Sequence, residues 1–128
     1  MFVKFKNFNK KIDGIEINLS CPNIVGKGQL AYDFKSLNTY LDELCTIYET
    51  ITYNMENKPI LGIKLPPYFE LDHFETVANI IVKYPINFIT CINSIGNGLI
   101  INYKTESTVI KPKDGIGGIG GGYAKPTG

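Results

Sequence analysis

Residues 59–67, which read PILGIKLPP, decide the fold class of this chain. The apolar run over residues 59–65 is too short for a helix, and the two prolines at its end cannot continue a backbone hydrogen-bonding pattern. We therefore predict a strand over residues 59–65. Its one charged residue, Lys64, needs a partner, because an unpaired ammonium is costly inside a buried strand.

Amphipathic helices are predicted on both sides of this strand. Upstream, Asp33 is placed to cap a helix that ends before Asn54. Downstream, Asp72 and Glu75 form a capping-box pattern for a helix that Pro85 ends. Apolar residues recur at helical spacing in both segments, at Leu37, Tyr40, Leu41, Leu44, Ile47 and Tyr48, and at Phe74, Val77, Ile80 and Ile81.

Two further apolar runs, residues 12–19 and 88–92, are predicted strands. Strands that alternate with helices predict a parallel sheet joined by crossovers, and hence an α/β fold. After residue 92 the pattern changes. Residues 98–101 and 107–110 fit two short strands of a hairpin, and the glycine tract 115–122 is predicted to be a loop.

The composition is that of one globular domain, with 128 residues of which 44% are hydrophobic and 20% charged. A formal charge of +1 argues against partners such as nucleic acid or an acidic membrane surface. Three cysteines without a CxxC pattern indicate neither a disulfide framework nor a zinc site, and His73, the single histidine, cannot complete a serine triad. With no apolar run near the roughly 20 residues of a membrane span, we expect a soluble, cytoplasmic protein.

Polar residues gather where the three predicted strands end. In α/β folds the ligand site lies beyond the carboxyl ends of the strands. The residues at these ends are Asn18, Ser20, Cys21 and Asn23 after the first strand, Lys64 in the second, and Asn93 and Ser94 after the third. We expect them to meet at one rim.

Each of these residues also has a purely structural interpretation. A free cysteine such as Cys21 is commonly a packed thiol, although in a polar loop it can serve as a base. Lys64 can bind an anionic ligand atom or pair with Glu16, an acid within the first predicted strand. Asparagines suit turns as well as planar ligands, and the glycine tract is either a surface loop or a close approach to a flavin or phosphate. Cys45 and Cys91, on a helix stripe and within a strand, are predicted to pack in the core.

Several segments of the chain resemble the dihydroorotate dehydrogenases. They are DGIEINLSCPN at 13–23, GK at 26–27, AYDF at 31–34, KLPPYF at 64–69, ITCINSIGNGL at 89–99, and residues 109–127 from VIKPK through the glycines to KPT. The resemblance covers about residues 12–127, in order. A cysteine in the first segment resembles class 1, and the KLPPYF and glycine patterns are most similar to class 1A, soluble homodimers that pass electrons from flavin mononucleotide (FMN) to fumarate.

The resemblance implies a function in pyrimidine biosynthesis, the FMN-dependent oxidation of dihydroorotate to orotate with fumarate as acceptor. It implies that Cys21 is the general base that removes the C5 proton. Substrate binding falls to Asn18, Asn23, Asn93 and Ser94, and FMN binding to Asn18, Lys64, Ser94 and Gly121. A related flavin-dependent dihydropyrimidine dehydrogenase, or a fragment without turnover, is the alternative.

The resemblance also implies a (β/α)8 TIM barrel, which needs about 250 residues. We therefore expect residues 1–128 to be the central part of a single flavin-binding barrel domain, incomplete at both ends. Residues 50–58 form a segment that is longer and more polar than the family usually has there.

Overall fold

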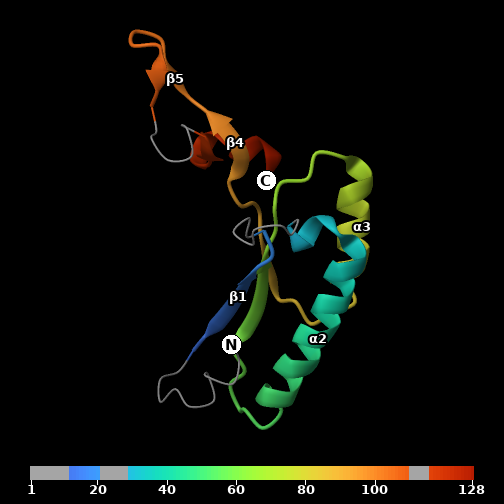
Figure 1. The fold of residues 1–128 in the computed structure, drawn as a ribbon. Helices are drawn as coiled ribbons and strands as arrows, with labels where there is room; N and C mark the ends of the chain where they lie inside the picture. The colour runs from blue at the N-terminus through green and yellow to red at the C-terminus, as the bar shows by residue number, and fades with distance from the viewer. Residues whose placement is uncertain (1–11, 21–28, 110–115) are drawn as a thin grey trace.

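The computed structural model describes residues 12–20, 29–109 and 116–128. Among the described residues, a parallel sheet and two α-helices form the main body, and residues 95–109 and 116–128 form a smaller part with antiparallel strands that extends away from it (Figure 1). This arrangement confirms the predicted α/β class.

The main sheet contains three parallel strands in the order β1 (Gly14–Asn18), β2 (Ile60–Lys64) and β3 (Phe88–Thr90). Its register sets Asn18 opposite Lys64, and Lys64 opposite Thr90. The predicted strands 12–19 and 59–65 match β1 and β2. The prediction for 88–92 is too long by two residues, because β3 ends at Thr90.

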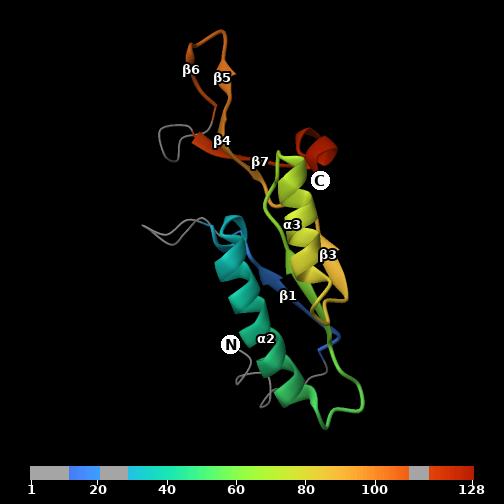
Figure 2. The same cartoon turned by 90° about the vertical axis from the view of Figure 1, so that its right-hand side faces the viewer.

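Both helices lie on the same side of the sheet (Figures 1 and 2). Helix α2 (Phe34–Thr52) begins at Asp33, whose carboxylate accepts a hydrogen bond from the Ser36 amide at 3.1 Å, as predicted. Helix α3 (Leu71–Ile81) has Glu70 at its N-cap without a side-chain bond, so the capping box predicted at Asp72 is wrong. Asp72 lies instead in the first turn, where its charge still complements the helix dipole.

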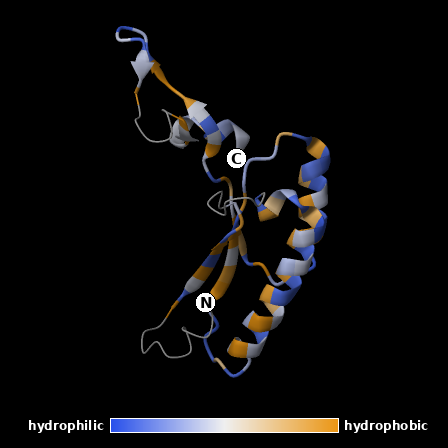
Figure 3. Cartoon of the chain, viewed as in Figure 1, coloured by the Kyte–Doolittle hydropathy of each residue, from blue (hydrophilic) through white to orange (hydrophobic). Residues whose placement is uncertain are grey.

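The core lies between the sheet and the helices. Hydrophobic and hydrophilic residues are interleaved along α2 and α3 (Figure 3), as one-sided packing requires. The largest apolar side chains excluded from solvent are Leu37, Leu41, Leu61 and Ile63. No helix in the described ranges is both long and apolar enough to cross a membrane.

Two tyrosines join the short helix η1 (Leu30–Tyr32) to the segment after β2. The Tyr32 hydroxyl donates to the Pro67 carbonyl at 2.7 Å, and the Tyr68 hydroxyl donates to the Ala31 carbonyl at 2.8 Å. The two rings meet edge to face with centroids 5.7 Å apart. These two hydrogen bonds hold η1 against the segment that follows β2.

The C-terminal part is built from short antiparallel strands. Strand β4 (Ile95–Leu99) pairs with β7 (Ile116–Ile119), and β5 (Ile101–Asn102) pairs with β6 (Ser107–Thr108) in a hairpin. Two 3-10 helices, η3 (Gly121–Tyr123) and η4 (Lys125–Thr127), follow. The predicted hairpin is therefore confirmed only over β5 and β6.

The glycine tract is not simply a loop, because residues 116–119 form β7. Gly117 pairs with Gly98 of β4, and a Cβ placed on Gly98 would run into the side chain of Ile119. Glycine is poor in strands by propensity, but here it permits a close approach that a larger residue would prevent.

Candidate active site

The carboxyl end of the parallel sheet brings together residues from all three strands. The Leu19 amide donates to the Lys64 carbonyl at 3.0 Å, and the Leu65 amide donates to the Thr90 carbonyl at 3.1 Å. The Asn93 amide then donates to the Leu65 carbonyl at 2.9 Å. Asn18, Lys64 and Asn93 consequently lie at one end of the sheet, as expected from the order of strands and helices.

A chain of side-chain hydrogen bonds links the segments after β1 and β3. Asn18 Oδ1 accepts from the Ser20 amide at 3.1 Å and from Ser20 Oγ at 3.0 Å. Ser20 Oγ in turn accepts from Asn93 Nδ2, and Asn93 Oδ1 accepts from the Ser94 amide at 2.9 Å. Two predicted binding asparagines are thus held by one serine.

Lys64 is half-buried and points its ammonium toward none of the described carboxylates at ion-pair distance. The alternative partner considered from the sequence, Glu16, instead accepts a hydrogen bond from Thr90 Oγ1. Within the described residues Lys64 therefore has no ion-pair partner, and the pairing with Glu16 that the sequence left open is not formed.

Ser94 and Gly121 line a common cavity of about 510 Å³ next to the antiparallel part. Its other walls include Cys91, Gly120, Ala124 and Lys125. Gly121 has a φ of +63°, which an L side chain rarely adopts. Gly118, close by, packs against Ser94, because a Cβ on Gly118 would lie 2.8 Å from Ser94 Cβ.

The three cysteines differ in their surroundings. Cys21, like Asn23, lies outside the described residues. Cys45 is packed in the core on α2, as predicted, and burial raises the pKa of its thiol to about 11. Cys91 was predicted to pack within a strand, but it is exposed and follows β3, whose own residues are only partly covered: Ile89 is 45% exposed.

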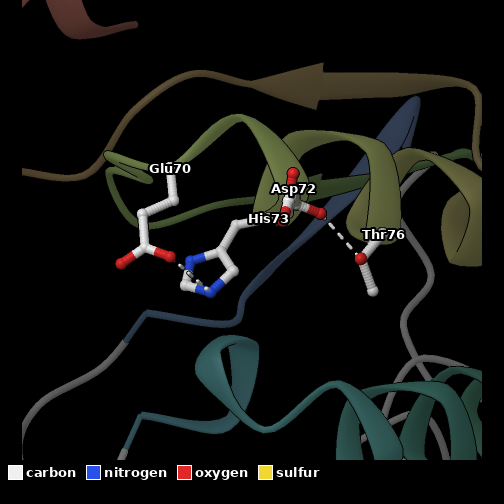
Figure 4. A network of polar contacts seen from close by, with 4 residues as sticks. All are labelled: Glu70, Asp72, His73 and Thr76. Atoms are coloured by element: carbon white, nitrogen blue, oxygen red, sulfur yellow. Dashed lines mark hydrogen bonds and ion pairs between the residues drawn. The ribbon is translucent and has the colours of Figure 1, made fainter.

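His73 forms no part of this site. Its Nε2 lies 3.6 Å from a Glu70 carboxylate oxygen at the start of α3, and Thr76 donates to the Asp72 carbonyl in the same turn (Figure 4). Across the described ranges, no group of three or more His, Cys, Asp or Glu side chains is arranged to hold a metal ion.

A second cavity of about 510 Å³ lies beside β1. Glu16, Asn18, Tyr40, Glu43 and Ile47 contribute to its walls. In the described part of the chain β1 pairs with β2 alone, so this cavity adjoins an unpaired sheet edge.

Comparison with known proteins gives the family. The family model for dihydroorotate dehydrogenase matches residues 1–128. The chain belongs to the dihydroorotate dehydrogenase family. It is 54% identical over 112 residues to "Dihydroorotate dehydrogenase A (fumarate)" of Lactococcus lactis subsp. lactis, and 55% identical over 112 residues to "Dihydroorotate dehydrogenase (fumarate)" of Kluyveromyces lactis. Each alignment covers 88% of this chain and 33% of the relative.

The dihydroorotate dehydrogenase resemblance found in the sequence is thereby confirmed, including its fumarate-type relatives. The chain spans about a third of the length of the curated relatives it matches. Sequence reasoning missed two features of this family member's site, the bridging position of Ser20 and the bond between Thr90 and Glu16. Both join strands distant in sequence, so only the strand register could have indicated them.

Proposed function

We propose that the protein containing this chain oxidises dihydroorotate to orotate with FMN as cofactor and fumarate as electron acceptor. Family membership and the names of the relatives support this activity. The structural observation that carries it is the meeting of Asn18, Lys64 and Asn93 at the carboxyl end of three parallel strands. Amides beside an uncompensated ammonium suit a planar ligand with carbonyl groups and a negative charge.

The residues described here fit a flavin. Lys64 supplies a positive charge at the carboxyl end of β2, and Ser94 and Gly121 line a cavity whose walls do not include Lys64 or Asn18. In this proposal Asn18, Lys64, Ser94 and Gly121 hold FMN. FMN supplies the hydride acceptor, and a fixed ammonium near its ring favours the reduced, more negative state.

The substrate is held by Asn18, Asn23, Asn93 and Ser94 in this proposal. Cys21 acts as the general base and takes the proton from C5 of dihydroorotate. Dihydroorotate loses the hydrogens on C5 and C6 as the C5=C6 double bond of orotate forms; the C5 proton goes to Cys21, and bound FMN would supply the acceptor for the hydride from C6. Fumarate would take up the two electrons together with two protons and become succinate.

We further propose that residues 1–128 are the central part of one (β/α)8 barrel domain. Three consecutive parallel strands with both helices on one side match such a barrel in order and packing. The cavity beside β1 adjoins the sheet edge at which a preceding strand would pair. The resemblance supports a cytoplasmic homodimer for the whole protein.

A substrate comparison tests this function. The full-length protein, loaded with FMN, is mixed anaerobically with dihydroorotate or with dihydrouracil, and reduction is followed by loss of flavin absorbance. We expect bleaching by dihydroorotate and reoxidation on addition of fumarate. Bleaching by dihydrouracil alone would assign the protein to the dihydropyrimidine dehydrogenases, and no bleaching by either would leave a fold without this activity.

A further inference from the structure

Ser20 stands out as one of two buried polar residues in the described ranges, with 2% of its surface exposed. The other is Thr52, whose hydroxyl bonds within its own helix, to the Tyr48 carbonyl at 2.8 Å. The Ser20 hydroxyl instead bonds to two side chains, Asn18 at the end of β1 and Asn93 after β3. Ser20 and Asn93 are 73 residues apart in the sequence. A buried hydroxyl that bonds to both side chains fixes the position of the end of β1 relative to the segment after β3.

The orientations of both amides follow from donor and acceptor rules. A backbone N–H can only donate, so the Asn18 atom that faces the Ser20 amide must be the oxygen. By the same rule, the Asn93 atom that faces the Ser94 amide is its oxygen, which leaves the Asn93 nitrogen pointing at Ser20. Neither amide is free to flip without losing a bond to the backbone.

The Ser20 hydroxyl completes this order. It must accept from Asn93 Nδ2, because an amide nitrogen is only a donor, and its single proton is then given to Asn18 Oδ1. The Asn18 oxygen is therefore occupied twice, by the amide and by the hydroxyl of Ser20. Both hydrogens on Asn18 Nδ2 are left without a partner in the described part of the chain, and the Asn18 side chain is exposed.

From this order we infer that Ser20 is a positioning residue that presents Asn18 to the ligand as a hydrogen-bond donor. The ligand atom that faces Asn18 must then be an acceptor, a carbonyl or carboxylate oxygen. The inference rests on the proposed function for the identity of the ligand. It assigns Ser20 a part in substrate binding that acts through two asparagines and not by contact with the substrate.

The test compares three variants of the full-length, FMN-loaded protein: Ser20→Ala, Ser20→Thr and Thr52→Val. Ser20→Ala removes the bridging hydroxyl, Ser20→Thr keeps it, and Thr52→Val is the matched control that removes an equally buried hydroxyl from the last turn of α2. The readouts are the Kd of orotate, from its perturbation of the flavin spectrum, the KM and kcat for dihydroorotate, and the FMN content.

We expect Ser20→Ala to weaken orotate binding and raise KM by about three- to tenfold, the effect of one neutral hydrogen bond. The pH profile of kcat should stay as in the wild type, since the base is not altered. FMN content should fall less than orotate affinity does, because Lys64, Ser94 and Gly121 still hold the cofactor in the proposed site. Ser20→Thr should restore binding to within about twofold, and Thr52→Val should leave Kd and KM unchanged while lowering the melting temperature.

Four results would overturn the inference. One is unchanged orotate affinity in folded Ser20→Ala, and another is an equal loss in Thr52→Val, which would mark a general effect of stability. If Ser20→Ala does not fold, Ser20→Cys replaces it, with a thiol that bonds only weakly, and wild-type affinity there would count against the inference equally. Wild-type protein that does not bind orotate would overturn the proposed function and this inference together.

Discussion

Cys21 is the side chain on which the proposed chemistry depends. Its replacement in Cys21→Ala should leave FMN bound but slow the oxidation of dihydroorotate by about 10²–10⁴-fold, the usual contribution of a positioned general base. Stopped-flow measurement of flavin reduction checks this value. Cys45→Ala, which removes a core thiol far along α2, is the control and should reduce flavin at the wild-type rate at a temperature where it is folded. Equal rates for Cys21→Ala and wild type would remove Cys21 from the reaction.

The position of a single residue could be predicted from the sequence where the end of its strand could be predicted. The apolar runs that contain Asn18 and Lys64 have the lengths of strands, and the carboxyl ends of parallel strands lie on one side of a sheet. The two residues were therefore expected to lie close together, and they are register partners in the structure. The exposure of Cys91 was not predictable, since an apolar run does not reveal that β3 is only partly covered by the rest of the described chain. The bond from Thr90 to Glu16 likewise depends on two neighbouring registers that no local pattern contains.

At the scale of elements, β2 and β3 depend on a glycine at their contact. The ring of Phe88, the register partner of Gly62, occupies the space that a Cβ on Gly62 would need. Gly62→Ala should therefore destabilise the protein by about 1–3 kcal/mol through overpacking. Gly96→Ala is the matched control, because nothing lies within 4 Å of its Cβ position.

Urea unfolding of both glycine variants measures the difference. Gly96→Ala should change the free energy of unfolding by less than about 0.5 kcal/mol, as surface substitutions usually do. A Gly62→Ala protein as stable as Gly96→Ala would show that the Phe88 ring does not occupy this space in solution.

The buried thiol of α2 predicts a dependence of stability on pH. Burial, with smaller contributions from Glu49 and Asp42, raises the pKa of Cys45 from 9.0 to about 11. The folded state therefore favours the protonated thiol, so its contribution is fully present below pH 9 and is lost as the pH rises through about 11. Unfolding curves taken across this range should show stability falling with pH.

A comparison with Cys45→Ala isolates the contribution of this thiol. Tyr68 also makes the folded protein less stable at high pH, because burial raises the pKa of its hydroxyl. The slope of stability against pH in the wild type therefore contains contributions from more than one group. The slope should be shallower in Cys45→Ala than in the wild type. Identical slopes in the two proteins would mean that Cys45 titrates alike in the folded and unfolded states.

Helices and strands could be predicted from the sequence wherever capping residues and apolar spacing within the segment were sufficient. Helix α2 combines an N-cap aspartate with apolar residues at helical spacing, and both signals are local. Strand β7 was missed because its glycines have low strand propensity, and its pairing with β4 is non-local. Tertiary contact, not propensity, makes residues 116–119 a strand.

At the scale of the whole molecule, the open edge of β1 carries a prediction about cofactor binding. Within the described residues the parallel sheet has three strands and β1 pairs on one side alone, whereas a closed barrel surrounds its site on all sides. Protein of the full length of the relatives should therefore purify yellow, with a flavin absorption band. Residues 1–128 expressed alone should carry less than about a tenth as much FMN per chain.

Protein-to-flavin ratios after desalting measure this difference, and circular dichroism shows whether residues 1–128 are folded when tested. Equal FMN content in both proteins would place the whole cofactor site within residues 1–128. Class, helices and parallel strands were predictable from local patterns. Local patterns do not separate an open sheet from a closed barrel, because both share the same apolar strands and amphipathic helices.

The β5–β6 hairpin extends away from the helices and the parallel sheet (Figure 1), and Tyr103 in its turn is 83% exposed. Strands β5 and β6 pair with each other and not with the parallel strands β1, β2 and β3, at whose end the ligand residues meet. A fluorophore or affinity tag placed at Lys104 would thus report on the molecule from a distance, without touching the residues that bind.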